Sequence, residues 1–180
     1  MKQKVSKRSI DGLEMEEFSW KSHSETVKRF HEDIVVSNIK PEHMSMRAYL
    51  QLFRSSREHG LPAYARSLRK AYDERKDGML IWRMGDKVVG WSWLQIHENE
   101  FFKEGAYGEL NEIYIVSKWR GKGLGKIMML HAFNWFRERR VSTIRVEVLA
   151  SNKAAIRFYR KFGFRLDYMS LQTDLSKQYR

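Results

Sequence analysis

A strand-like segment that runs into a glycine-rich loop and then into a helix is the most constraining feature of this sequence. Residues 110–136 read LNEIYIVSKWRGKGLGKIMMLHAFNWF. The apolar, β-branched run Ile113–Val116 is typical of a strand, and apolar residues at helical spacing follow the loop Arg120–Gly125. Unshielded glycine amides at a helix N-terminus form a binding site for phosphate or pyrophosphate. Cationic side chains lie at the same place: Arg120, Lys122 and Lys126.

The loop differs from the two best-known nucleotide-binding motifs. A Walker A loop requires a glycine five residues before the Gly of Gly-Lys-Ser/Thr, but here Arg120 occupies that position and Ile127 follows Lys126. The dinucleotide motif GxGxxG fails because Lys126 stands at its third glycine. The glycines alone also allow a second interpretation, in which they only permit tight turns.

Length and composition indicate one folded domain. A chain of 180 residues can bury a substantial core, and it contains no apolar run of about 18 residues that would span a membrane. The basic N-terminus is not followed by an apolar segment of signal-peptide length. Cysteine is absent, which excludes disulfides, thiolate zinc sites and a cysteine nucleophile. We therefore expect a cytoplasmic protein.

The formal net charge of +12 would attract nucleic acid, a membrane surface, an acidic protein or a polyphosphate cofactor. The charge is spread along the chain, and its densest cluster, Arg137–Arg140, closes a helix, where cations favour the negative end of the dipole. A solvated basic surface is therefore favoured over a dedicated nucleic-acid face. The histidines show no metal-ligand spacing, and we predict no metal site.

The N-terminal half is less clearly patterned. Residues 1–20 are expected to form a partly disordered arm with one short strand near Leu13–Phe18. The run Ile34–Val36 is too short to assign. A helix is predicted from Pro41, with apolar residues at helical spacing: Met46, Tyr49, Leu50 and Phe53. Gly60–Pro62 is predicted to break it, and a second helix then carries Ala63, Tyr64, Leu68 and Ala71.

The C-terminal half alternates strands and helices. Met79–Met84 and Lys87–Ile96 flank a short turn and predict an antiparallel hairpin. The later elements follow in chain order: a strand to Val116, a helix to Arg139, a strand at Ser142–Leu149, a helix at Asn152–Phe162 and a strand at Phe164–Met169. Such alternation predicts a parallel strand pair joined by a crossover helix.

Two stretches together resemble the GNAT superfamily of acyl-CoA-dependent N-acyltransferases. Arg120–Gly125 fits the Arg/Gln-x-x-Gly-x-Gly/Ala loop of that family, and Asn152–Phe164 fits its second characteristic stretch. The resemblance covers residues 109–164, about a third of the 180 residues. It implies an α/β (α+β) fold with a mixed six- or seven-stranded sheet, about four helices, and parallel strands splayed around the coenzyme A site. Residues 21–180 would then form a single acetyltransferase domain whose cofactor-binding core is 109–164.

The resemblance also implies which residues hold acetyl-CoA. Loop amides would bind the pyrophosphate, and backbone groups of the preceding strand would contact the pantetheine arm. The implied cofactor-binding residues are Ile115, Val116, Arg120, Gly121, Lys122, Gly123, Leu124, Gly125, Lys126 and Asn152. Position alone also suits Asn152 as the N-cap of the last helix.

Acyl transfer requires a proton donor for the leaving thiolate and a base for the acceptor amine. Tyr159 resembles the family tyrosine that protonates the coenzyme A sulfur; helical spacing alone would make it a core aromatic. Three glutamates compete as the base. Glu109 and Glu147 match base positions of different family members, and Glu109 is slightly favoured. Glu112 falls on the opposite strand face from Glu109 by simple alternation, unless a strand bulge changes the parity.

Two functions are consistent with these features. The first is an N-acetyltransferase that moves an acetyl group from acetyl-CoA directly to a primary amine of a small molecule, peptide or protein, in a ternary complex. The alternative is an acyl-CoA-binding module that binds nucleic acid or an acidic partner through its basic surface. For the acetyltransferase we expect no membrane association and an acceptor that the sequence does not identify. It would act as a monomer or a homodimer.

Overall fold

A computed structural model describes residues 3–4, 10–38, 54–100 and 105–169. The chain divides into two compact units, Met1–Glu147 and Val148–Arg180. The first unit contains a sheet of six strands whose spatial order follows the sequence. The strands are β1 Gln3–Lys4, β2 Leu13–Glu17, β3 Gly78–Met84, β4 Lys87–Glu98, β5 Ala106–Ile115 and β6 Ile144–Arg145. All neighbours pair antiparallel except β5 and β6, which are parallel.

Most of the elements predicted from the pattern are present. The hairpin of β3 and β4 turns at Gly85–Asp86, and β2 covers the strand expected near Leu13–Phe18. Helix α4 (Leu124–Glu138) follows the glycine loop, and α5 (Lys153–Arg160) follows Asn152 in the second unit. With α1 (Trp20–Asn38) and α3 (Leu61–Glu74), these make four α-helices in the described ranges, and the mixed six-stranded sheet confirms the predicted fold class. No described helix is long and apolar enough to cross a bilayer.

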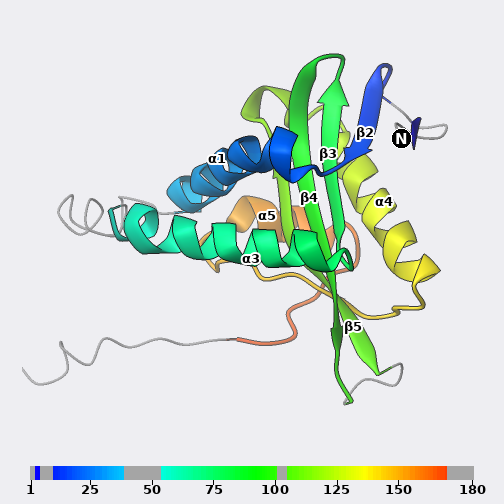
Figure 1. The fold of residues 1–180 in the computed structure, drawn as a ribbon. Coiled ribbons are helices and arrows are strands. Elements are labelled where there is room, and N and C mark those ends of the chain that lie inside the picture. The colour runs from blue at the N-terminus through cyan, green and yellow to red at the C-terminus, as the bar shows by residue number, and fades with distance from the viewer. Residues whose placement is uncertain (1–2, 5–9, 39–53, 101–104, 170–180) are drawn as a thin grey trace, which may run out of the picture. The chain divides into compact units, whose positions relative to one another are not determined.

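Helix α1 (Trp20–Asn38) is an element that the sequence pattern left unassigned, and Ile34–Val36 lies within it. Together with α3 (Leu61–Glu74) it covers one face of the sheet, while α4 lies on the other (Figure 1). The core between α1, α3 and the sheet is rich in aromatic residues, including Phe18, Tyr64, Trp91, Trp93 and Tyr114. This core holds α1 against β5, because burial of large aromatic side chains stabilises the packing of the two elements.

Three boundaries differ from the sequence predictions. The break expected at Gly60–Pro62 is absent: a π-helical turn, Ser56–Gly60, leads directly into α3, where the proline occupies the first turn and its missing N–H costs nothing. The strand expected at Ser142–Leu149 is reduced to Ile144–Arg145. Phe164–Met169 forms no strand, because no described residue pairs with it. The helix predicted from Pro41 to Phe53 lies outside the described residues.

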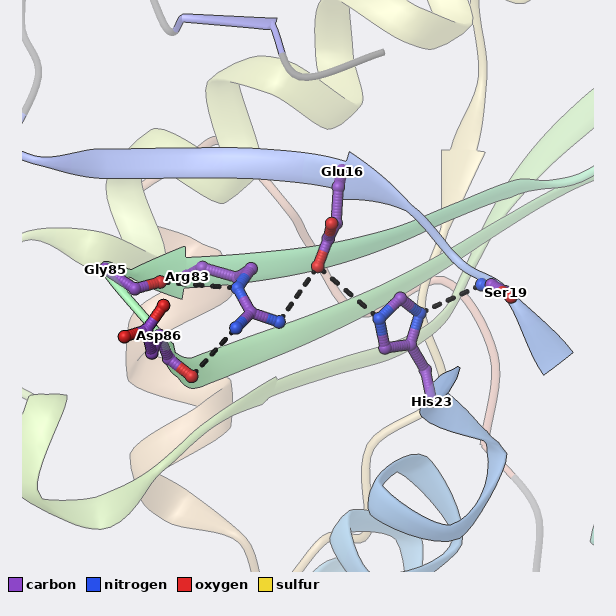
Figure 2. A network of polar contacts seen from close by, with 6 residues as sticks. All are labelled: Glu16, Ser19, His23, Arg83, Gly85 and Asp86. Atoms are coloured by element: carbon purple, nitrogen blue, oxygen red, sulfur yellow. Dashed lines mark hydrogen bonds and ion pairs between the residues drawn. The ribbon is translucent and has the colours of Figure 1, made fainter. Parts of the chain in front are cut away.

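A polar network fixes the start of α1 against the sheet (Figure 2). Oε1 of Glu16, on β2, accepts a hydrogen bond of 3.0 Å from Nη1 of Arg83 and lies 3.4 Å from Nε2 of His23. The amide of Ser19 donates to Nδ1 of His23 at 2.9 Å, so His23 is neutral with its proton on Nε2. Arg83 also donates to carbonyl groups of the β3–β4 turn. Burial lowers the pKa of His23.

Candidate functional site

The glycine loop projects from the end of β5 as an open turn. A 3₁₀ turn, Ser117–Trp119, follows the strand, and α4 begins at Leu124. Gly121 and Gly123 have φ angles of 75° and 89°, a region that favours glycine. An added Cβ atom would meet nothing within 4 Å at either glycine. The glycines are therefore required by the backbone conformation, and the space above them is open to a ligand.

The amides of this loop are available for an anion. Before the loop, the last backbone hydrogen bond is donated by the N–H of Arg120 to the carbonyl of Ser117. After it, the N–H of Lys126 donates to the carbonyl of Gly123. Within the described chain, no partner is recorded for the five amides between them, Gly121 to Gly125. They lie at the positive end of α4, so the loop has the donors and the dipole that a phosphate group requires.

The three cations of the loop differ in how they are held. Arg120 donates from Nε to the carbonyl of Ile115 at 2.8 Å, and its guanidinium lies 5.6 Å from the ring centroid of Tyr114. Lys122 lies 5.0 Å from the ring centroid of Trp119. Lys126, in the first turn of α4, is exposed. Arg120 is thus fixed to the end of β5, whereas the exposed Lys126 extends from the start of α4.

One edge of β5 is open beside this loop. β5 pairs with β6 only at Gly108 and Glu109, and beyond them its described partner is β4 alone. The N–H of Val116 donates to the carbonyl of Val89, and its carbonyl accepts from Trp119, so both groups are already used. Antiparallel alternation then directs the N–H and C=O of Ile115 away from β4. Of the two predicted strand residues, Ile115 faces the open edge, and the same alternation adds Ile113.

A bulge in β5 places two of the candidate glutamates on one face. Glu109 lies opposite Gln95 and Glu112 lies opposite Trp93, with Asn111 as the extra residue. The side chains of Trp93 and Gln95 both donate to Oδ2 of Asp77, at 2.6 and 2.8 Å, so they share a face. The bulge alternative is therefore confirmed, and the opposite-face arrangement expected from simple alternation is wrong.

Glu112 is a buried carboxylate that accepts three hydrogen bonds. Its Oε2 accepts from the hydroxyl of Tyr64 at 2.6 Å and from Nε1 of Trp91 at 2.7 Å, and Nδ1 of His31 lies 2.9 Å from its Oε1. The partners come from α3, β4 and α1. Only 7 % of Glu112 is exposed. Burial, and then the nearby carboxylate, raise the pKa of Tyr64, which remains a donor.

The other two glutamates have different surroundings. Oε2 of Glu109 lies 2.6 Å from Nε2 of His97, and both side chains are partly exposed. Glu147 is exposed and lies after β6, outside any strand. Of the three, Glu112 alone is enclosed by donors from several elements.

Asn152 and Tyr159 belong to the second unit. Asn152 is the N-cap of α5, because its Oδ1 accepts from the amide of Ala155 at 3.0 Å. Tyr159 packs against the rings of Phe158 and Phe164. Burial raises the pKa of Tyr159 to about 12. Its hydroxyl group is therefore protonated at neutral pH and able to donate.

Three residues near Glu112 and Tyr114 were not recognised in the sequence. His31 and Asp33 come from α1, and Tyr64 from α3 was seen only as a helix-face residue; the hydroxyl of Tyr114 donates to Oδ2 of Asp33 at 2.8 Å. Val27, Phe30 and Ile34, spaced by three and four residues, would have indicated α1.

A mixed sheet with one parallel pair that opens beside a glycine loop, and a helix that begins at that loop, is the architecture of an α/β N-acyltransferase. The model of the acetyltransferase (GNAT) family matches residues 46–164. The chain belongs to this family.

Sequence relatives share this part of the chain. A mycothiol acetyltransferase of Rhodococcus erythropolis is 32% identical over 82 residues, 44% of this chain and 26% of that protein. An uncharacterized N-acetyltransferase of Methanocaldococcus jannaschii is 26% identical over 89 residues, 49% of this chain and 39% of that protein. The chain thus matches only a minor part of each of these relatives.

Solved structures share the fold at low sequence identity. A GCN5-related N-acetyltransferase from Ralstonia eutropha has a TM-score of 0.71 at 14% identity, over 92% of this chain and 99% of that one. A predicted acetyltransferase from Clostridium acetobutylicum, solved with acetyl-CoA, has a TM-score of 0.65 at 15% identity, over 93% of this chain and 99% of that one.

Proposed function

We propose that this protein transfers an acetyl group from acetyl-CoA directly to a primary amine, within a ternary complex. The observation that carries the proposal is the glycine loop: its amides from Gly121 to Gly125 have no recorded partner in the described chain, and they lie beside the open edge of β5. This combination suits a substrate that has a pyrophosphate at one end and an amide-containing arm at the other. Family membership supports the same substrate.

The residues present fit acetyl-CoA in chemical type. Loop amides and the ammonium groups of Lys122 and Lys126 would hold the phosphates. The outward backbone groups of Ile113 and the outward N–H of Ile115, whose carbonyl already accepts from Arg120, would pair with the amides of the pantetheine arm, as one strand pairs with another. Because Val116 has its own N–H and C=O engaged, it would contribute packing rather than backbone bonds.

The chemistry requires a proton donor and a proton acceptor. Tyr159, protonated at neutral pH, would protonate the departing sulfur, as the family resemblance implies. Asn152 would contact the pantetheine arm in addition to capping α5. A glutamate, or a group that a glutamate positions, would take the proton from the acceptor amine; Glu109, Glu112 and Glu147 are the acidic candidates. No covalent enzyme intermediate is needed, which agrees with the absence of cysteine.

The acceptor is proposed only as a primary amine. The name mycothiol acetyltransferase describes relatives of which the match covers 26% in the example above, so it does not transfer to this chain as a substrate. Net positive charge disfavours a polyamine and favours a peptide, a protein or a neutral small amine.

Calorimetric titration with acetyl-CoA and with dephospho-coenzyme A tests the proposal. We expect micromolar binding of acetyl-CoA and weaker binding without the 3′-phosphate. A Lys122→Ala/Lys126→Ala double variant should bind acetyl-CoA more weakly than the wild type does. Lys87 is exposed at the start of β4, and Lys87→Ala should bind acetyl-CoA as the wild type does. Release of the coenzyme A thiol is then followed with a panel of amines: a peptide with a free N-terminus, Nα-acetyl-lysine, phenethylamine and an amino sugar.

Two outcomes would contradict the proposal. Absence of acetyl-CoA binding would mean that the glycines serve only the turn. Salt-sensitive binding of DNA or RNA, with a slope that corresponds to several phosphate contacts and without amine acetylation, would favour the alternative of a basic binding module.

A further inference from the structure

His31 is held by Glu112 in one orientation. Nδ1 of His31 lies 2.9 Å from Oε1 of Glu112, and the other carboxylate oxygen already accepts from Tyr64 and Trp91. An ionised carboxylate can only accept, so Nδ1 carries the hydrogen in this contact. In the neutral ring, the lone pair is then on Nε2, the nitrogen that points away from the carboxylate.

The ring of His31 is also fixed from one side. It stacks on Tyr64 with centroids 3.7 Å apart and an interplanar angle of 9°. The His31 side chain is 26% exposed, whereas that of Glu112 is 7% exposed. In the described part of the chain, no partner is recorded for Nε2. His31 therefore combines a defined tautomer with access to a ligand, whereas Glu112 is held by hydrogen bonds but is not accessible.

His31, on α1, lies beside β5, the strand that borders the proposed acetyl-CoA site. One turn of α1 contacts Tyr114: Phe30 stacks on its ring with centroids 4.4 Å apart, and Asp33 accepts a hydrogen bond from its hydroxyl. Tyr114 in turn lies beneath Arg120 of the glycine loop. Glu112 precedes Tyr114 by two residues, about 6.6 Å along the strand. The His31–Glu112 pair is thus farther from the phosphate-binding loop than Tyr114 is, on the same face of β5.

We propose that Nε2 of His31 is the general base for the acceptor amine and that Glu112 is its positioning residue. This inference rests on the proposed function and names its base. The acceptor ammonium gives one proton to Nε2, and the free amine attacks the thioester carbonyl carbon. As the C–N bond forms and the C–S bond breaks, the nitrogen loses its second proton to solvent water, and the sulfur receives the hydroxyl proton of Tyr159, which water then reprotonates. The imidazolium then releases its proton to water. Glu112, whose oxygens are occupied by three donors, does not itself take the proton.

The first test measures coenzyme A thiol release with the amine panel, for which a chain without cysteine gives no thiol background. His31→Ala and His31→Gln should lower kcat by about 10²-fold or more, with the Kd for acetyl-CoA unchanged. Added imidazole should restore activity to His31→Ala. The matched control is His59→Ala, because His59 is an exposed histidine in the same unit; this variant should retain wild-type activity and show no rescue.

The second test separates a base from a structural side chain. The acidic limb of the pH profile of kcat/KM should disappear in His31→Gln, which has no ring to protonate. It should move in Glu112→Gln, because Glu112 and Tyr64 are the titratable side chains that contact His31 among the described residues. Long-range ¹H–¹⁵N NMR of the wild type should show the proton of neutral His31 on Nδ1. This measurement requires neither acceptor nor turnover.

The outcomes distinguish this inference from the proposed function. If the wild type transfers acetyl groups and His31→Gln does so equally well with the same pH profile, His31 is not the base and the proposed function stands. A neutral ring protonated on Nε2 overturns the inference whatever the activity. A wild type that neither binds acetyl-CoA nor acetylates any amine of the panel overturns both.

Discussion

The hydroxyl of Tyr64 donates a 2.6 Å hydrogen bond to Oε2 of Glu112, a residue 48 positions away in the chain. This bond joins α3 to β5 inside a core of aromatic side chains. The same oxygen accepts from Trp91, and His31 on α1 approaches the other oxygen. One buried carboxylate therefore connects the two helices of this face to the strand that borders the proposed acetyl-CoA site.

Tyr64→Phe should destabilise the protein, because it removes one donor from a buried carboxylate while keeping the ring. Loss of such a bond to a charged group costs about 1–3 kcal/mol. The free energy of unfolding in denaturant measures this cost. Tyr72→Phe is the control, since no hydrogen bond of the Tyr72 hydroxyl is recorded in the described residues and its ring contacts with Phe18 and Trp20 would remain. Equal stability of the two variants would show that Glu112 does not depend on this donor.

Gly108→Ala should destabilise the first unit through overpacking. A Cβ atom at Gly108 would lie 2.5 Å from Cε1 of Phe136, which is fully buried and cannot move away without cost. We expect a loss of about 1–3 kcal/mol or more in the free energy of unfolding. Gly60→Ala is the matched control: Gly60 has a helical φ of −66°, and its Cβ would meet only Ser56 Oγ at 3.6 Å. That change should be neutral or stabilising by about 0.4–1 kcal/mol, and a destabilised Gly60→Ala alongside a stable Gly108→Ala would contradict the packing.

Stability should fall as the pH drops below the ordinary histidine pKa of 6.5, in part because of His23. Burial lowers the pKa of His23 in the folded state, so below 6.5 the unfolded chain binds more protons than the folded one. The contribution of the neutral ring is fully present above 6.5 and decreases with falling pH until the folded-state pKa is passed.

Unfolding measured from about pH 8 to pH 5 checks this linkage. The difference between wild type and His23→Gln should shrink as the pH falls, because the variant has no ring to protonate. His59→Gln, which removes an exposed histidine, should follow the wild-type curve. A constant difference between wild type and His23→Gln at every pH would refute the linkage.

Tyr159→Phe should lower turnover without weakening acetyl-CoA binding. Because burial raises the pKa of Tyr159 to about 12, the hydroxyl is a proton donor throughout the neutral range. Removal of a general acid costs about 10²-fold or more in kcat, and calorimetry should report an unchanged Kd. Tyr168→Phe, which alters a tyrosine that is 77% exposed in the same unit, is the control. Full activity of Tyr159→Phe would remove Tyr159 from the reaction.

Local signals predicted those elements whose structure depends on nearby residues. The β3–β4 hairpin, the glycine loop, α4 and α5 follow from turn residues, apolar periodicity and capping within short windows. Helix α1 was missed because its few apolar residues lie among charged ones, and tertiary burial compensates for that weak pattern. The short β6 and the absence of a strand at Phe164–Met169 were not predictable, since strand length depends on a partner elsewhere in the chain.

The candidate site also has a part that nearby residues predict and a part that depends on distant ones. Short-range sequence signals were enough to predict a loop suited to phosphate, because glycines, a helix N-terminus and adjacent cations all lie within the few residues from Arg120 to Lys126. Which glutamate is enclosed, and by which partners, depends on tertiary packing. The bulge at Asn111 turns Glu112 to the same face as Glu109, and helix packing brings Tyr64 and His31 to it from 48 and 81 residues away. Such long-range contacts depend on how separate elements bury their apolar faces together, which no short segment encodes.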